Sequence, residues 1–352
     1  VDARMGVRGV SSLRLTAAAR YDDYSDFGDT VNPQFGLVWS PAPDIALRFS
    51  GGTSFSPPNL FSMFAPLQEF PFAVTDPRRN ETVPVTLLVG GNPALRPVEG
   101  ESTTAGLIFT PAAAPGLRLV ATYWELEVDS RVTVVPGQQL VDFEPLFGSR
   151  VIRAAPTADD IAAGRPGQIT SVDITRINFG RLKTSGVDWE GSWSWDTRRG
   201  RITPSLAGTW TARYSSIELP GTSPIERVGV ASTGGTVPKW KMVATLGWTR
   251  GAVGASATAR YTHSYDDASF LTGPTGRRIP ALTLIDMQAS VELDGVTSGL
   301  SSWLRGIKLT AGVANLFDKA PPFSELYGES GYDGTQADLI GRSGYLSLSK
   351  AF

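Results

Sequence analysis

The chain has no cysteine and a single histidine, His263, among its 352 residues. Without cysteine it forms neither disulfides nor thiolate metal sites, although this alone identifies no compartment. Its formal net charge of −2 gives no bulk attraction to nucleic acid, so we expect no nucleic-acid partner. No run of apolar residues approaches the roughly 18 to 20 that a transmembrane helix needs. If the protein lies in a membrane, it must therefore cross it with strands.

The chain does have a repeated alternation of apolar and polar residues. In the clearest segment one parity is mainly apolar and the other is polar: Val187, Trp189, Gly191, Trp193 and Trp195 against Asp188, Glu190, Ser192, Ser194 and Asp196. The same period of two recurs from Arg201 to Tyr214 and from Ile285 to Leu293. Such alternation over about ten residues per segment is typical of membrane β-barrels, whose strands are apolar toward lipid and polar toward the lumen.

The alternating segments indicate about twelve strands. Upward strands are expected near residues 12–22, 45–53, 116–133, 201–215, 253–265 and 305–316, and downward strands near 34–41, 102–110, 172–195, 237–249, 282–294 and 343–352. Tight turns alternate with long loops, which are expected near 54–101, 134–171, 216–236, 266–281 and 317–342. Bacterial outer-membrane barrels show this asymmetry, with short periplasmic turns and long extracellular loops.

We therefore predict an all-β, antiparallel transmembrane barrel. A soluble β-sandwich or β-solenoid also alternates, but its strands are usually shorter and it has no reason to pair short turns with long loops. Within one loop, Thr157–Gly164 predicts a short helix that is capped by Thr157 and ended by the glycine. An outer-membrane barrel is exported, whereas this sequence begins at Val1 without a signal peptide, so we expect an N-terminal part to be missing from it.

Three motifs occur in a fixed order along the chain. Ser54–Leu60 reads SFSPPNL, Gly91–Glu99 reads GNPALRPVE, and Gly312–Lys319 reads GVANLFDK before a final segment that ends at Phe352. In this order the motifs resemble segments of TonB-dependent outer-membrane receptors, and the resemblance extends over nearly the whole chain. Three departures stand out, because Val98 interrupts the usual Pro-Glu pair, Ser56 replaces the usual arginine, and Lys350 occupies an otherwise apolar parity near the end.

The resemblance implies a barrel of about 22 strands, filled by an N-terminal plug that engages the energy-transducing protein TonB. Residues 1–352 would then be the C-terminal part of the barrel, without the plug. An open half-barrel exposes two strand edges inside the membrane. Either further strands complete the sheet, or these strands close into a smaller barrel of their own.

Catalytic chemistry has little support in the sequence. His263 shares the parity of Tyr261, which places it toward lipid or the interface, where a general base or metal ligand is not expected. Asp188 and Glu190 are paired carboxylates, but lumenal charge explains them without acid–base chemistry. We predict no enzyme activity, no metal site and no cofactor.

Ligand binding has more support. Arg20, Arg213 and Arg260 lie on the polar parity near the extracellular ends of their strands, joined by Arg176 if the register of Trp189 extends back that far. Guanidinium groups that face one lumen would attract an anionic ligand. Ion pairs with Asp22, with neighbouring strands or with the plug are the favoured alternative, because charges in a polar lumen have many partners.

The loop aromatics form a second candidate surface. Phe55, Phe61 and Phe64, together with Phe70 and Phe72, lie in the loop expected over residues 54–101. Their rings would stack on an amphipathic ligand, or they would pack the loop upon itself.

Two functions follow as hypotheses. The first is active uptake of a scarce ligand across the bacterial outer membrane, coupled through the plug to TonB. An iron–siderophore complex is the commonest ligand in the resembled family, and cobalamin, sugars and other metals stay open as alternatives. The second is a passive pore or a structural barrel without energy coupling. In both cases the strands contact outer-membrane lipid.

Overall fold

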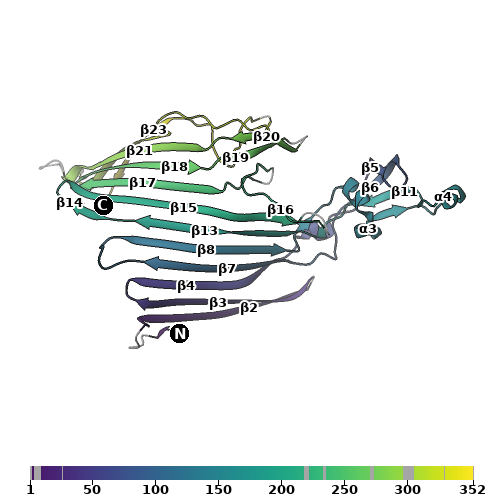
Figure 1. Ribbon diagram of the computed structural model, residues 1–352, viewed down its shortest axis with the longest axis horizontal. Coiled ribbons are helices and arrows are strands. Elements are labelled where there is room, and N and C mark those ends of the chain that lie inside the picture. The colour runs from purple at the N-terminus through teal and green to yellow at the C-terminus, as the bar shows by residue number, and fades with distance from the viewer. Residues whose placement is uncertain are drawn as a thin grey trace.

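The computed structural model describes residues 2–3, 9–25, 27–217, 222–232, 235–269, 273–295, 305–328 and 330–351. Its main feature is one large sheet whose long strands each lie antiparallel to their neighbours (Figure 1). In sheet order the long strands are β2 (Ser12–Tyr24), β3 (Gly28–Ala42), β4 (Ile45–Ser56), β7 (Val98–Phe109), β8 (Arg118–Asp129), β13 (Arg181–Ser192), β15 (Gly200–Ile217), β17 (Trp240–Arg250), β18 (Val253–Thr262), β21 (Leu282–Glu292), β22 (Ile307–Ala314) and β23 (Ser343–Lys350). These strands confirm the predicted number and order.

Short elements complete the large sheet and its loops. The short strands β1 (Asp2–Ala3), β14 (Trp195–Thr197) and β16 (Ile225–Glu226) pair with long strands of the sheet. The pairs β9 (Val132–Thr133) with β12 (Ile177–Asn178), and β19 (Tyr265–Ser269) with β20 (Gly273–Ile279), lie in the long loops. Short 3₁₀ turns occupy Gly148–Arg150 and Leu293–Gly295. Phe352 lies outside the described residues.

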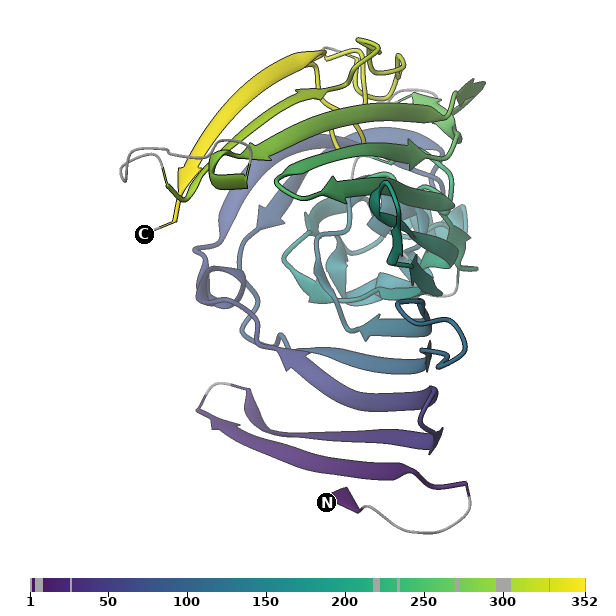
Figure 2. The same ribbon diagram turned by 90° about the vertical axis from the view of Figure 1, so that its left-hand side faces the viewer.

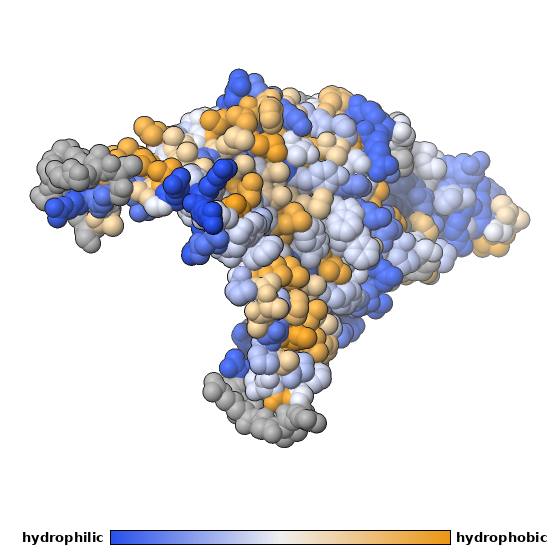
Figure 3. Space-filling model, turned by 60° about the vertical axis from the view of Figure 1, so that its left-hand side comes forward, coloured by the Kyte–Doolittle hydropathy of each residue, from blue (hydrophilic) through white to orange (hydrophobic). Residues whose placement is uncertain are grey.

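The two faces of the sheet follow the predicted alternation. Pairing places Asp188 opposite Thr122 and Thr209 on the polar face, which we call the lumenal face. Pairing also joins apolar and small residues across neighbouring strands on the other face: Leu119, Gly191, Leu206, Ala244, Ala259 and Ile285. Apolar side chains stay exposed on this outer face, where Leu206 is 44% and Leu246 is 55% accessible. Figure 3 shows hydrophobic side chains (orange) at the surface of the molecule along the sheet. Exposure of large apolar side chains over a whole sheet suits contact with lipid rather than water.

The sheet is curved but open. Among the described residues, β2 pairs with β1 and β3 and β23 pairs with β22, and no pairing joins β2 to β23. Figure 2 shows the N-terminal strands (purple) and β23 (yellow) at opposite ends of the curve. Of the two alternatives, closure of these strands into a small barrel of their own is therefore not seen in the described part of the chain.

Two of the long loops together build a lobe at the long-loop end of the sheet, which the sequence did not predict. The lobe sheet has the order β10 (Val151–Arg153), β11 (Ile169–Asp173), β6 (Glu81–Val89) and β5 (Gln68–Asp76), and it projects beyond the ends of the long strands (Figure 1). Because β11 belongs to the lobe, the strand expected over 172–195 begins only at Arg181. Likewise, the loop expected over 54–101 contains the paired strands β5 and β6.

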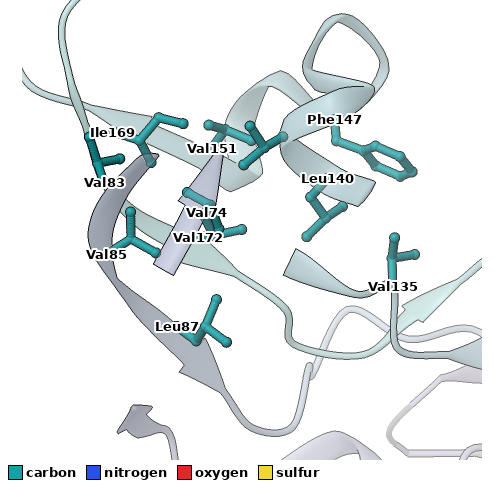
Figure 4. Packing of buried hydrophobic residues seen from close by; sticks show 11 residues of the cluster. Val74, Val83, Val85, Leu87, Val135, Leu140, Phe147, Val151, Ile169 and Val172 are labelled. Carbon is teal, nitrogen blue, oxygen red and sulfur yellow. The ribbon is translucent and has the colours of Figure 1, made fainter. Parts of the chain in front are cut away.

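The lobe has its own hydrophobic core. Side chains from β5, β6, β11 and the helix α2 (Gly137–Asp142) point toward one another (Figure 4). Val74 and Val172 are fully buried, and Leu140 is 1% accessible. The helix α3 (Glu144–Phe147) adds Phe147 to this core.

The remaining helices are short. The helix α4 (Ala158–Ala162) has Thr157 as its N-cap in a capping box with Asp160, and Gly164 follows with φ of 65°, which confirms the predicted capped helix. The helix α1 (Leu60–Phe64) follows β4. None of the described helices has the length and apolar character needed to span a membrane.

Candidate ligand-binding surfaces

The lumenal face of the sheet forms a cavity of about 640 Å³. Arg48, Lys241 and Arg260 contribute basic groups to its lining, and Asp188 and Glu190 contribute acidic ones. The strand register explains why these side chains converge. Pairing runs from Arg48 through Gly106 and Thr122 to Asp188, Thr209 and Lys241, so these residues occupy one row across the sheet.

The charges in this cavity are not all neutralised. Glu190 pairs with Arg118 at 3.2 Å, whereas Asp188 Oδ1 accepts a 2.7 Å hydrogen bond from the neutral Thr209 hydroxyl and keeps its negative charge. Among the described residues, Arg48 and Lys241 lie in no ion pair. Arg48 donates instead to the Thr122 hydroxyl, at 2.6 Å. Two cations are therefore available to an anionic group in the cavity.

Arg260 lies on the lumenal face, as predicted, but it has a carboxylate partner. Its Nε is 2.8 Å from Asp286 Oδ2, and its Nη2 is 3.1 Å from Oδ1. This bidentate geometry fixes the guanidinium beside the cavity. Its charge is thus less available to a ligand than those of Arg48 and Lys241.

Arg20 also lies on the lumenal parity, on the edge strand β2. Its Nε and Nη2 donate to Asp22 at 3.0 and 2.8 Å, which is the ion pair that the alternative interpretation expects. The Arg20 side chain is 72% exposed, so the pair contributes little to stability. The lining of the 640 Å³ cavity does not include Arg20.

The predicted lumenal position of Arg213 is wrong. Ser185 pairs with Arg213 whereas the next residue, Gly186, pairs with Thr211, so Ala212 is an extra residue in β15. A bulge of this kind reverses the parity of the strand beyond it. Arg213 therefore faces outward with Ser185, while Thr211 keeps the lumenal face.

The strand position expected for Arg176 is also wrong, because the residue lies in the loop between β11 and β12. Its guanidinium carbon instead lies 5.8 Å from the centre of the Phe61 ring. A cation at this distance from an aromatic face is attracted by the π-electrons. The structure thus brings together two predicted ligand residues, Arg176 and Phe61. They meet beyond the ends of the long strands rather than on the lumenal face.

Phe61 and Phe64 lie on α1 and are 67% and 57% exposed, so they do not pack the loop upon itself. Hydrogen bonds fix the start of this helix: its N-cap Asn59 accepts a 2.7 Å hydrogen bond from the Ser62 N–H. The motif residue Asn92 donates from its backbone to the Ser62 carbonyl and from its side chain to the Arg176 carbonyl, both at 2.9 Å. The GNP motif therefore anchors the exposed aromatic residues to the loop that carries Arg176.

Phe55 differs from the other predicted aromatic residues. It belongs to β4 rather than to a loop, and its ring lies 5.9 Å from Tyr24 and 6.5 Å from Phe27. These contacts make Phe55 part of an aromatic cluster at the turn between β2 and β3. Phe70 and Phe72, on β5, are each 48% exposed.

Sequence reasoning missed Arg48 and Lys241. The sequence contains the pattern that would have found them, since Arg48 lies between the apolar residues Leu47 and Phe49, and Lys241 lies between Trp240 and Met242. Both fit the period-two rule that located Arg260. His263 lies beside Tyr261 as expected, with its Nδ1 2.9 Å from the tyrosine hydroxyl.

Comparison with solved structures gives a consistent likeness. The ferric enterobactin receptor PfeA of Pseudomonas aeruginosa is 17% identical with a TM-score of 0.64, over 97% of this chain and 43% of that one. The siderophore receptor PirA of Acinetobacter baumannii is 15% identical with a TM-score of 0.61, over 97% and 43%. The FrpB iron transporter of Neisseria meningitidis is 11% identical with a TM-score of 0.53, over 96% and 42%.

At these identities the likeness shows the fold, and the chain spans less than half the length of these solved structures. No curated protein matches the chain. The family described as TonB dependent receptor-like, beta-barrel, matches residues 4–316, which is most of the chain. The chain therefore belongs to the TonB-dependent receptor-like β-barrel family.

Proposed function

We propose that this chain is the C-terminal part of an outer-membrane receptor for TonB-dependent uptake of a scarce anionic ligand. An iron–siderophore complex is the first candidate, because similar folds include siderophore receptors. The observation that carries the ligand class is the lumenal cavity with Arg48 and Lys241, whose charges lack a carboxylate partner among the described residues. The exposed Phe61 and the adjacent Arg176 provide a first contact surface for a ligand with aromatic groups.

The open edges support a larger barrel. A strand edge without a neighbouring strand carries a large desolvation cost in hydrocarbon. In the described part of the chain β2 has only the two-residue strand β1 on its outer side and β23 pairs with β22 alone, which favours further strands at both edges. We propose that these strands belong to a barrel of about 22 strands, whose plug contacts TonB and couples ligand release to energy. The bacterial outer membrane is the proposed location.

Uptake assays distinguish this function from the passive-pore alternative. Cells that express the full-length protein are supplied with radiolabelled ferric complexes of catecholate, carboxylate or hydroxamate chelators. Uptake of one complex in wild-type cells, and its loss in cells without TonB, is the expected result. Equal uptake with and without TonB would establish the passive pore instead.

The cavity is tested by the double variant R48Q/K241Q. Loss of one charge-assisted hydrogen bond, about 1.5 to 3 kcal/mol, predicts at least about tenfold weaker binding of the transported complex. R213Q is the matched control, because Arg213 faces outward. Unchanged affinity in R48Q/K241Q, with normal barrel abundance, would remove the cavity from the proposed binding site.

A further inference from the structure

Two apolar grooves lie side by side on the outer face of the sheet. The first has a volume of about 510 Å³, and its lining includes Trp193 and Leu206. The second has a volume of about 580 Å³, and its lining includes Trp248 and Ala289. Leu246 lines both grooves and is 55% exposed, so it forms the ridge between them.

Both grooves end near tryptophans at the short-turn end of the sheet. Trp248 Nε1 donates to the Arg199 carbonyl at 2.9 Å, and Trp193 Nε1 donates to the Pro115 carbonyl at 3.3 Å. Indoles held in this way, with an apolar ring and a polar edge, mark the boundary between hydrocarbon and headgroups. Short turns are periplasmic in outer-membrane barrels, so this boundary belongs to the periplasmic leaflet.

Positive charge lies next to the same boundary. Arg199 is in the turn before β15, and Arg250 follows Trp248 on the outward parity at the end of β17. Both side chains are exposed, and neither forms an ion pair within the described part of the chain. Asp196, the acid of the same turn, is already paired with Arg201 at 2.9 Å.

We propose that these features form a binding site for one anionic diacyl phospholipid of the periplasmic leaflet. One acyl chain fills each groove on either side of Leu246, and the phosphate lies between Arg199 and Arg250. The inference rests on the proposed membrane location. The apolar linings accept hydrocarbon, and the two arginines select a negatively charged headgroup, because guanidinium groups bind phosphate through paired hydrogen bonds.

The site is tested by quenching of tryptophan fluorescence with brominated lipids. The full-length protein is reconstituted into phosphatidylcholine vesicles that contain either brominated phosphatidylglycerol or brominated phosphatidylcholine at the same mole fraction. In the wild type, the brominated anionic lipid should quench the tryptophans more strongly. In R199Q/R250Q this preference should fall about 30-fold, since each arginine near an anionic surface contributes about 1 kcal/mol.

Two further variants separate charge from shape. R96Q/R131Q removes two exposed arginines at the extracellular end and should keep the preference. A257F fills a position shared by both grooves and should reduce the preference while leaving both arginines in place. Equal quenching by both brominated lipids in the wild type, or an unchanged preference in R199Q/R250Q, would overturn the site. Absence of quenching by either lipid would instead contradict the membrane location itself.

Discussion

The lobe depends on a buried arginine with two carboxylate partners. Arg153 Nη1 lies 2.6 Å from Asp76 Oδ2, and its Nη2 lies 2.7 Å from Glu144 Oε2. The Asp76 side chain is fully buried, and the Glu144 and Arg153 side chains are each 11% accessible. Replacing Arg153 by methionine keeps most of the apolar volume but leaves two negative charges in the lobe without their main partner.

We expect R153M to destabilise the lobe by about 3 kcal/mol. Removal of one partner from a buried ion pair typically costs about 3 to 5 kcal/mol. The lower end applies here, because Asp76 still accepts a 3.0 Å hydrogen bond from the Arg78 N–H and Glu144 still lies 3.4 Å from the Arg78 guanidinium. A loss of about 3 kcal/mol increases the open population of the lobe by about two orders of magnitude.

Amide hydrogen exchange of β6 and β11 in the full-length receptor measures this opening. R165M is the matched control: Arg165 is 40% exposed, and its partner Asp160 is also held by Arg79 at 2.7 Å. Its effect should stay within about 1 kcal/mol. Wild-type protection of β6 and β11 in R153M would refute the reasoning, as would a general loss of protection in the long strands.

The pH dependence gives an independent check. Burial alone would raise the pKa of Asp76, but the hydrogen bonds from Arg153 and from the Arg78 backbone outweigh it, so the pKa is lowered. The Arg153 hydrogen bond likewise lowers the pKa of Glu144. A lowered pKa in the folded state stabilises the lobe above the usual carboxylate range of about 4, and this stability is lost as the pH falls below it. In R153M both carboxyl groups lose the Arg153 hydrogen bond that lowers their pKa, so the defect should be largest at neutral pH and should shrink on acidification.

Two further changes test the faces of the long strands. Leu206→Arg should cost about 2 to 4 kcal/mol in a folding titration in lipid, because the side chain is exposed on the outer face, whereas Ser205→Arg on the lumenal face should be mild. Equal costs for the two changes would contradict the register. Gly312→Ala should reduce barrel assembly, because its added Cβ would overlap the ring of Tyr345, and the double change with Tyr345→Ala should restore it. Assembly is measured by gel electrophoresis of unheated samples, in which a folded barrel migrates differently from the heat-denatured chain. Normal migration of the unheated single Gly312 variant would show that Tyr345 moves aside.

The long strands were predictable because each carries its own pattern. Alternation along β15 or β21 depends on one residue in two facing lipid, and no knowledge of the neighbouring strands is required. The bulge at Ala212 was not predictable, because it is a property of the pairing between β13 and β15 rather than of either strand. The error in Arg213 follows directly from it.

The lobe could not be predicted from the sequence for a related reason. Pro71 and Pro84 interrupt β5 and β6, and prolines normally argue against a paired strand. They are tolerated because β5 is an edge strand and because β11 pairs with β6 only at residues 86–88, beyond Pro84. The parallel pairing of Thr86 with Ser171 joins segments far apart in the chain, and no local sequence pattern predicts it.

The same pairing imposes an order of events during folding. The lobe sheet needs β6 from the loop after β4 and β11 from the loop after β8, so β7 and β8 must emerge between them before the lobe can form. Contacts between segments this distant in sequence form slowly, because the long intervening chain must first be closed. The lobe should therefore be completed late. It should then hold the loop that follows β4 against the loop that precedes β13. A chain whose long strands have paired in the wrong register would be unable to pair β6 with β11 and form the lobe sheet.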